Sequence, residues 1–493
     1  MSIFLLLSPI LVLSVGALLL MLAEALLNAK QGLSLGASIV SFAAMFVALG
    51  LWAAGPESLG TDVLLPWLAV DATSLFLTAL VCFASGISAM FAGGYLVEHK
   101  MERGEFYPLM LFSTVGAVIL ISATDMLTLF LGLETLSLGV YAMVAFRRTS
   151  PRATEASMKY FLLGSFAAAV MIFGIAMLYG ATGHTDFPGL AAALVTFNGT
   201  ANGPLAIFGM AMVLIGLAFK VSAVPFHMWT PDAYEGAPTP VTAYMAVVVK
   251  VAAFASIIRV FLGPFGVPSM TGWGSGWPPV FALLALLTMT VANLVAGQQE
   301  SVKRMLAYSS VAHAGYLLVG VVASSRNPDA ATSGMLFYLA AYAVSTLGAM
   351  GVLMLMGSRG LEATSYEDLA GIGRRHPALG IAMALFLFSL AGVPPTGGFF
   401  GKWMIFKSAV DGGFVWLTVL GFLNSVLGAY YYLRVLVFMY MRDPALGAPV
   451  AKPMRSPTMS VAVAFSALLV LALGVLPATT WSATRPVVAA VAP

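Results

Sequence analysis

The sequence PLAIFGMAMVLIGLAFKVSAVPFHMWTPD, residues 204–232, sets the expected architecture of this chain. It is apolar and too long for one straight membrane helix, which needs about 20 residues, and Pro225 interrupts it. A second apolar run, PALGIAMALFLFSLAGVPPTGGFFGKWMIFKSAVD at residues 377–411, is interrupted by GVPPTGG at Gly392–Gly398. Proline removes a helical N–H donor and clashes with the preceding turn, and glycine relaxes the backbone further. We therefore predict two discontinuous helices.

The rest of the chain has the composition of a membrane protein. Of its 493 residues, 60% are hydrophobic and only 9% are charged, and the mean hydropathy is +0.97. So little polar surface excludes a soluble domain of this length and makes the lipid bilayer the expected solvent. Apolar runs long enough to span a bilayer start near residues 3, 33, 70, 106, 126, 156, 204, 240, 276, 302, 331, 377, 414 and 457. We predict an all-α polytopic fold with about 14 transmembrane helices.

Charge and cysteine usage exclude several kinds of partner and cofactor. The net charge of +3 forms no basic block that could follow a phosphate backbone, which argues against nucleic acid. The single cysteine, Cys82, excludes an internal disulfide, a multi-thiolate zinc site and a cysteine-ligated iron–sulfur cluster. No pair among the five histidines is placed like haem axial ligands, so a haem-bearing electron carrier is the weakest alternative. We expect no cofactor in this chain.

Lysine and arginine are distributed unevenly between the loops on the two sides of the predicted bundle. One side has only Arg259, Arg326 and Arg485. The other side has 14 basic residues: Lys30, Lys100, Arg103, Arg147, Arg148, Arg152, Lys303, Arg304, Arg359, Arg374, Arg375, Arg442, Lys452 and Arg455. By the positive-inside rule the richer side is cytoplasmic, which places both termini in the periplasm of a bacterial inner membrane. The link around Asp232 and Glu235 is the exception, because it contains neither Lys nor Arg.

The two interrupted runs fall in equivalent places of an expected internal repeat. If segments four to eight form one unit and segments nine to thirteen another, each break lies in the fourth helix of its unit. The sixth and tenth segments also open alike, with EASMKYFLLGSF and ESVKRMLAYSSV. A five-helix unit crosses the membrane an odd number of times, so its copy is inverted, as in ion and proton transporters. Proline kinks in an ordinary helix bundle are the alternative.

This repeat gives the expected domain boundaries. They are a three-helix N-terminal segment at residues 1–105, the first five-helix repeat at 106–263, the second, inverted repeat at 276–440, and a C-terminal helix and tail at 457–493.

Four of the charged residues inside the predicted spans stand out, because a charge near the centre of the bilayer costs about 2.5–3.5 kcal/mol on insertion scales. Glu134 and Lys250 lie well inside their segments, while Lys220 precedes the first break and Lys402 follows the second. Lysine suits proton transfer because its proton affinity responds strongly to desolvation and to neighbouring charges. We expect Glu134 and Lys220 to interact across facing helices. The structural alternatives are a protonated Glu134 between helices and lysines that extend to the membrane surface.

Three further residues are candidates for the same chemistry. His227 and His313 lie where apolar sequence becomes polar and could relay protons near neutral pH, although each could also be a structural histidine. Lys159 lies at the start of the sixth segment, where it could modulate the Glu134 and Lys220 pair or anchor the interface. The eleventh segment offers no ionisable group except two tyrosines. Transfer from Lys250 to Lys402 would therefore need water or a histidine.

Several of these motifs resemble the antiporter-like membrane subunits of complex I and the Mrp-type cation/proton antiporters. The resemblance spans about residues 105–440 and is carried by LFLGLETLSLGVYAMVAFRR, EASMKYFLLGSFAAAVMIFGIAMLYGATG, FKVSAVPFHMWTPDAYEGAPTPVTAYMAVVVKVAAF, KRMLAYSSVAHAGYLL and SLAGVPPTGGFFGKW. The stretch PDAYEGAPTPVTAY looks most like the N-type branch, because the L and M types usually continue with a histidine-bearing PTPVSALIH pattern. Lys402 also fits the N type, since the M type is expected to have glutamate there.

The resemblance implies function and partners. It implies a subunit of a proton-translocating NADH:quinone oxidoreductase, with no redox centre of its own, that couples electron transfer in partner subunits to proton pumping. It also implies the roles: Glu134 and Lys220 as the coupling pair, Lys250 as the central relay, and Lys402 on the path to the outer side. The implied partners are other membrane-arm subunits, especially neighbouring antiporter-like subunits, and the lipid bilayer. The alternatives are an Mrp-type cation/proton antiporter subunit without a redox partner and a passive scaffold that only seals a membrane arm.

Overall fold

The computed structural model describes residues 3–27, 32–55, 64–195, 202–274, 276–357, 362–444 and 453–478. Within these ranges the chain is helical, and its β contacts are three isolated bridges. Four of the basic residues used for orientation and part of the C-terminal tail lie outside the described ranges: Lys30, Arg359, Lys452, Arg485 and residues 479–493.

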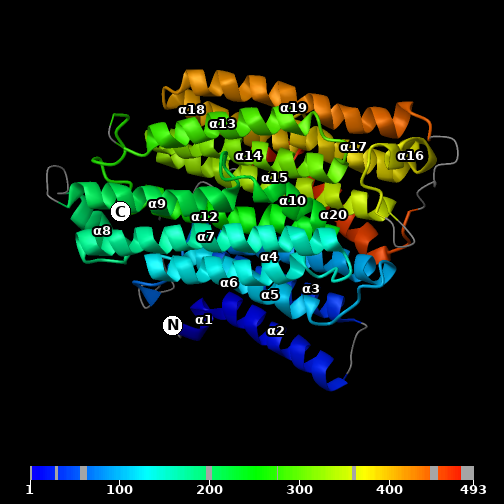
Figure 1. Ribbon diagram of the computed structural model, residues 1–493, viewed down its shortest axis with the longest axis horizontal. Coiled ribbons are helices and arrows are strands. Elements are labelled where there is room, and N and C mark those ends of the chain that lie inside the picture. The colour runs from blue at the N-terminus through cyan, green and yellow to red at the C-terminus, as the bar shows by residue number, and fades with distance from the viewer. Residues whose placement is uncertain are drawn as a thin grey trace.

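The helices run roughly parallel along the long axis of the molecule (Figure 1). They are α1 (Ile3–Leu6), α2 (Ser8–Leu27), α3 (Leu33–Ala53), α4 (Ala72–Glu98), α5 (Phe106–Ser122), α6 (Met126–Val144), α7 (Pro151–Thr182), α8 (Phe187–Val195), α9 (Gly203–Val221), α10 (Trp229–Gly236), α11 (Thr239–Tyr244), the π-helical turn η3 (Met245–Val249), α12 (Lys250–Leu262), α13 (Pro278–Ala296), α14 (Val302–Ser324), α15 (Pro328–Met356), the 3-10 turn η4 (Glu367–Leu369), α16 (Ile372–Arg375), α17 (Pro377–Ala391), α18 (Gly397–Asp411), α19 (Val415–Met441) and α20 (Pro457–Val475).

The number of membrane crossings agrees with the sequence prediction. Among the described residues, 12 helical segments are long and apolar enough to cross a membrane, and α5 and α17 are shorter apolar helices. Each of the fourteen predicted segments corresponds to one of these helices, counting α9 with α10 and α17 with α18 as single interrupted crossings. The predicted all-α polytopic fold is confirmed.

Both predicted helix breaks are present, and they are built alike. Helix α9 ends at Val221, and Ser222 then takes a left-handed conformation with φ 65° before the chain resumes as α10. Helix α17 ends at Ala391, and Gly392 takes the same conformation with φ 87° before α18. A left-handed residue commonly terminates a helix, and the prolines that follow prevent continuation.

One close helix–helix contact occurs at equivalent places in the two predicted five-helix units. In the first unit, α6 lies so close to α5 that a Cβ on Gly132 would be 2.6 Å from the backbone nitrogen of Leu120. In the second unit, α14 lies equally close to α13, and a Cβ on Gly315 would be 2.6 Å from the backbone nitrogen of Met289. Glycine permits such approaches because it has no side chain. The first and second helices of each predicted unit therefore approach each other at a glycine.

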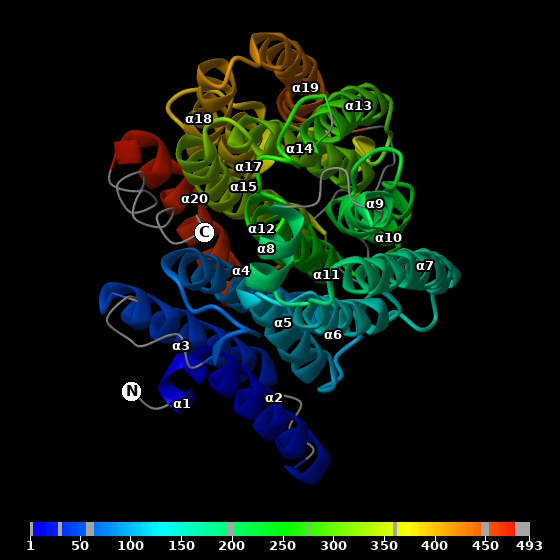
Figure 2. The ribbon, with the colours of Figure 1, turned by 90° about the vertical axis from the view of Figure 1, so that its left-hand side faces the viewer.

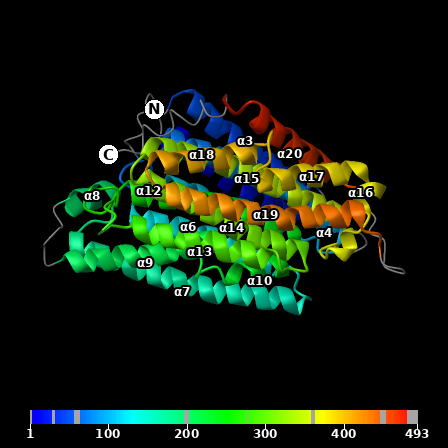
Figure 3. The ribbon, with the colours of Figure 1, turned by 90° about the horizontal axis from the view of Figure 1, so that it is seen from above.

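The centre of the bundle is formed by α4, α12, α14 and α15, whose side chains are almost all buried. Viewed along the helix axes, α2 and α3 lie at one end of the cross-section and α13, α18 and α19 at the other (Figure 2). Helix α20 crosses obliquely over one side of the bundle, as the view from above shows (Figure 3), and contacts α15 and α4. The charged residues discussed below lie within or beside this central group.

Candidate functional site

Three lysines lie in the interior of the bundle, where a charged side chain is costly. Lys220, Lys250 and Lys402 are only 3%, 2% and 6% exposed. Lys220 lies two residues before left-handed Ser222, Lys250 directly follows the π-helical turn η3, and Lys402 lies on α18 after the second break. Each ammonium group is therefore placed where regular helical backbone is interrupted or distorted.

Lys220 is held by two hydroxyl groups of the first repeat. Its Nζ donates to Ser137 Oγ at 2.7 Å and to Tyr160 OH at 3.3 Å. Ser137 in turn donates to the backbone carbonyl of Leu133. The ring of Tyr160 stacks on Trp229 of α10 with centroids 4.2 Å apart. The resumed half of the broken helix thus packs directly on a group that holds Lys220.

Glu134, the predicted partner of Lys220, lies one turn before Ser137 on α6 and is half-buried. Its Oε1 is buried without a hydrogen-bond partner among the described residues. The charges of Glu134 and Lys220 act on each other, but these two described side chains form no direct ion pair. Lys220 is hydrogen-bonded to Ser137 instead. A cavity of about 10 Å³ beside Lys220 is at the lower limit for one water molecule.

Lys250 links three central helices. Its Nζ donates to the backbone carbonyl of Ser310 on α14 at 2.5 Å. Ser310 Oγ accepts a hydrogen bond from Tyr342 OH of α15 at 2.9 Å. A π-helical turn adds one residue to the helix repeat and is frequent at functional sites, and here it immediately precedes the buried lysine. Lys250 and Tyr342 therefore meet at one residue of α14.

Lys402 is held by the backbone that the second break exposes. Its Nζ donates to the carbonyl of Ala391 at 2.9 Å and to Ser425 Oγ at 2.8 Å, and it lies 4.9 Å from the ring centroid of Tyr316. Ala391 is the last residue of α17, so its carbonyl has lost its helical partner. A cation is also favoured at a helix C-terminus. The break thus supplies the acceptor for the lysine that follows it.

The two candidate histidines have different surroundings. His313 on α14 is 2% exposed, and its ring nitrogens contact the hydroxyl groups of Tyr338 and, at 3.0 Å, Tyr432. His227 lies in the first break, half-buried, with its ring centroid 6.4 Å from that of Tyr308. Its Nδ1 is buried without a hydrogen-bond partner in the described part of the chain. The structure brings His313, but not His227, into hydrogen-bonded contact with buried polar groups near the lysines.

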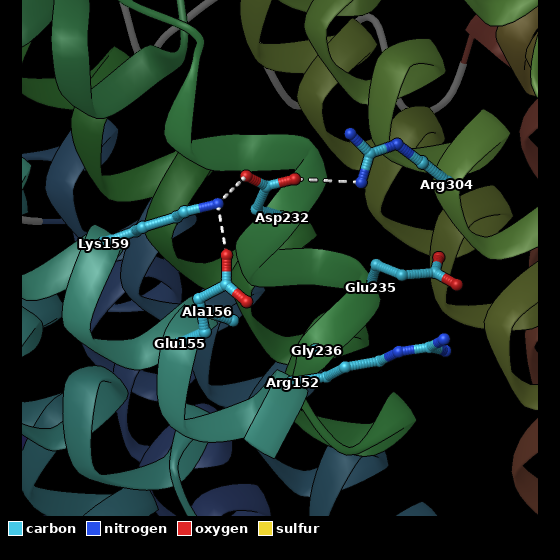
Figure 4. Close-up of a pocket in the computed structure, with 8 residues that line it drawn as sticks. All are labelled: Arg152, Glu155, Ala156, Lys159, Asp232, Glu235, Gly236 and Arg304. Atoms are coloured by element: carbon cyan, nitrogen blue, oxygen red, sulfur yellow. Dashed lines mark hydrogen bonds and ion pairs between the residues drawn. The ribbon is translucent and has the colours of Figure 1, made fainter. Parts of the chain in front are cut away.

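Lys159 lies outside the buried core, at the rim of a charged cavity of about 250 Å³ (Figure 4). The cavity is lined by Arg152, Glu155, Ala156, Lys159, Asp232, Glu235, Gly236 and Arg304. Lys159 Nζ lies 2.7 Å from Glu155 and 3.0 Å from Asp232, and the other oxygen of Asp232 accepts from Arg304 at 3.0 Å. The link around Asp232 contains no basic residue, but Asp232 forms ion pairs with one basic residue from α7 and one from α14.

The buried ion pair between Lys303 and Glu362 is not predicted from the sequence. Glu362 accepts hydrogen bonds from Tyr95, from Thr239 at 3.0 Å and from Lys303 at 3.3 Å, and Arg147 lies 3.7 Å away. Burial raises the pKa of Glu362, but the charge of Lys303 and the hydrogen bonds from Tyr95 and Thr239 outweigh it, so the pKa falls below its ordinary value. From the sequence, Lys303 counts among the basic loop residues and Glu362 has no assigned role. Instead, they join the ends of α4, α11 and α14.

No metal-binding arrangement accompanies these charges in the described ranges. Groups of three or more His, Cys, Asp or Glu side chains placed to hold an ion are absent there. Cys82 is fully buried in α4 as a free thiol.

Comparisons of this chain with a family model and with known proteins indicate the same family. The family described as NADH:quinone oxidoreductase/Mrp antiporter, TM, matches residues 123–428. NADH-quinone oxidoreductase subunit N 1 of Sorangium cellulosum is 58% identical over 96% of each chain, and subunit N of Myxococcus xanthus is 41% identical over 96% of this chain and 95% of its own.

Solved structures agree in fold. A chain of respiratory complex I from Thermus thermophilus with bound aureothin is 33% identical, with a TM-score of 0.79 over 97% of this chain and 99% of that chain. A chain of the Mrp complex from Dietzia shares the fold, with a TM-score of 0.84 over 99% of this chain and 97% of its own, at 20% identity. The chain belongs to the NADH:quinone oxidoreductase/Mrp antiporter family, in its NADH-quinone oxidoreductase subunit N branch.

Proposed function

We propose that this chain moves protons across a bacterial inner membrane as a membrane-arm subunit of an NADH-quinone oxidoreductase. Its relatives of 58% and 41% identity carry the name NADH-quinone oxidoreductase subunit N. The 33% identical chain is part of respiratory complex I. The partners are then other membrane-arm subunits, including neighbouring antiporter-like subunits, and the redox cofactors belong to those partners.

The observation that carries this proposal is the contrast between two kinds of buried lysine. Lys303, 1% exposed, is compensated by the carboxylate of Glu362. Among the described residues, Lys220, Lys250 and Lys402 donate hydrogen bonds to neutral hydroxyl and carbonyl oxygens and to no carboxylate. A buried ammonium without an adjacent counter-ion is held as a cation weakly, because desolvation favours its neutral form. Such a lysine can take up and release a proton, whereas an ion-paired one serves structure.

The roles follow the order of these groups along the bundle. Glu134 and Lys220 form the coupling pair, because each carries a charge that acts on the other without a direct ion pair. Lys250 and His313 continue the path on α12 and α14, and Lys402 delivers protons to the outer side. Lys159 at the charged rim and His227 in the first break are accessory groups. Both termini face the periplasm in this orientation.

Replacing Glu134 by Gln tests the coupling role, because it removes the charge that acts on Lys220 and keeps the shape of the side chain. We expect NADH-driven proton pumping by the reconstituted complex to fall several-fold, with NADH oxidation falling alongside it. The matched control is Glu300→Gln, which neutralises an exposed carboxylate and leaves both rates unchanged. A Glu134→Gln complex that assembles and pumps like the control would show that Glu134 is only structural.

A further inference from the structure

Between Lys250 and Lys402, a buried histidine is held between two tyrosines. His313 lies on α14, three residues after Ser310, the residue that binds Lys250. The charges of both Lys402 and Lys250 act on its ring. Tyr338 of α15 contacts Nδ1 and Tyr432 of α19 contacts Nε2 at 3.0 Å. Three separate helices therefore converge on one imidazole.

The hydrogen-bonded chain extends beyond the ring on both sides. Tyr432 OH also contacts Ser309 Oγ, on the turn of α14 that carries Ser310. On the other side, Tyr338 packs against the helix of Lys402 so closely that a Cβ on Gly401 would lie 2.6 Å from its ring. The chain thus starts one residue from the carbonyl that binds Lys250 and ends beside the residue preceding Lys402.

We propose that Tyr338 and Tyr432 are relay residues that, with His313 between them, pass protons between Lys250 and Lys402. This rests on the proposed proton-moving function and names the groups that bridge its two inner lysines. All five buried side chains of the bridge are polar: Ser309, Ser310, His313, Tyr338 and Tyr432. A neutral imidazole donates from one nitrogen and accepts at the other, and a phenol does both, so the ring and its two tyrosines can be ordered in either direction.

The transfer balances without a charged tyrosine. A proton received at Ser309 Oγ displaces the serine proton to Tyr432, whose own proton passes to His313 Nε2. The ring proton on Nδ1 then passes to Tyr338, and the Tyr338 hydroxyl proton leaves toward Lys402. Every O–H or N–H bond broken is replaced by one formed. The only net change is that each hydrogen bond of the relay now points in the opposite direction from donor to acceptor. The original direction is restored when the hydroxyl groups rotate and the imidazole proton moves back from Nε2 to Nδ1.

Tyr432→Phe provides the test, because it removes one oxygen from the relay and retains the ring. The matched control is its neighbour Tyr431→Phe, since Tyr431 is equally buried but donates to Asn293 Oδ1 at 2.9 Å rather than to His313. In proteoliposomes containing the purified complex at equal content of this chain, we expect about a tenfold lower NADH-driven pumping rate for Tyr432→Phe than for Tyr431→Phe. The solvent deuterium isotope effect on pumping should also rise only for Tyr432→Phe, since proton transfer becomes limiting.

Two further variants keep the outcome decisive. Tyr338→Phe should show the same loss, and the double variant should be no slower than either single one, because both residues act in one chain. Equal pumping by Tyr432→Phe, Tyr338→Phe and Tyr431→Phe would overturn the relay. Lys402→Ala, measured in the same series, separates the two levels: if it pumps normally the proposed function itself fails, and if it alone loses pumping only the tyrosine relay fails.

Discussion

The buried lysines of this protein divide into two kinds according to the groups that accept their hydrogen bonds. Lys303 lies against a carboxylate, and that carboxylate also accepts from Thr239 and Tyr95. Lys402 instead donates to the end of a helix and to a serine hydroxyl. A buried cation with a carboxylate partner is strongly destabilised when that partner is removed. Glu362 should therefore affect stability more than transport.

Glu362 gives a pH-dependent stability prediction. Its pKa in the folded protein is below the ordinary value of 4.5, so its ion pair contributes fully above that value and is lost as pH falls through the lower folded value. At pH 7, Glu362→Gln should lower the free energy of unfolding by about 3–5 kcal/mol, because Lys303 is left without its counter-ion. Thermal unfolding of the purified complex over roughly pH 3–7, the range in which linkage to this carboxyl group acts, measures the effect.

The double variant Glu362→Gln/Lys303→Met is the control for that measurement, since it removes both charges. It should recover much of the lost stability and show less acid sensitivity than the native protein. A single variant as stable as the native chain would mean that the ion pair contributes nothing.

The functional residues that could be predicted from the sequence are charged residues in apolar runs, where burying a charge costs free energy. Lys220, Lys250 and Lys402 stand in apolar runs, so their burial could be predicted and is confirmed. Lys303 and Glu362 could not be recognised, because both occur in polar stretches where exposure is the ordinary outcome. They become a buried pair only through contacts between segments far apart in the chain, and the local sequence pattern does not predict such contacts.

At the scale of elements, the buried lysines lie beside irregular stretches of helical backbone. The breaks after Val221 and Ala391 were predictable because proline and glycine cannot continue a helix there. The π-helical turn Met245–Val249 was not, because the stretch YMAVVVKVAAF contains no residue that interrupts a helix. The surrounding helices α4, α5 and α15 contact this turn. The π-helical turn is therefore associated with its packing against neighbouring helices and not with a helix-breaking residue in the sequence.

The glycine contacts between paired helices give an element-scale prediction. Gly132→Ala places a Cβ 2.6 Å from the Leu120 backbone nitrogen, so α5 and α6 must separate, at a cost of about 1–3 kcal/mol. The complex should unfold at lower temperature and pump less, because Glu134 lies on the displaced helix. Gly50→Ala is the matched control, since a Cβ there meets nothing within 4 Å and alanine favours a helix by about 0.5–1 kcal/mol. Equal thermal stability of the two variants would contradict the close-packed repeat.

The whole molecule joins two similar units through a shared polar interior. Glu134 and Lys220 lie in the first unit, while His313 and Lys402 lie in the second, and Lys250 of α12 reaches across to Ser310 of α14. At one end of the bundle, Asp232 bridges Lys159 of the first unit and Arg304 of the second. Order of the helices was predictable from hydropathy and from the two breaks. The contacts between units were not, because they depend on how the two copies dock.

Orientation in the membrane is a prediction for the whole molecule. The excess of basic residues on one side places Thr149 in the cytoplasm and Asp329 in the periplasm. Both positions are exposed, and the native thiol of Cys82 is fully buried. A membrane-impermeant maleimide added to intact spheroplasts should label Asp329→Cys and spare Thr149→Cys, and permeabilised membranes should label both. The reverse pattern in spheroplasts would invert the topology.

The most direct measurement of the central claim is the number of protons pumped per NADH oxidised by reconstituted complexes that differ only at Lys402. The account predicts that Lys402→Ala and Lys402→Arg both lose most pumping, because alanine carries no proton and arginine does not release one. Lys407→Ala, on the same helix but 61% exposed and paired with Asp411, should pump normally. A Lys402→Arg complex that pumps as well as the Lys407→Ala control would contradict the claim that Lys402 exchanges protons.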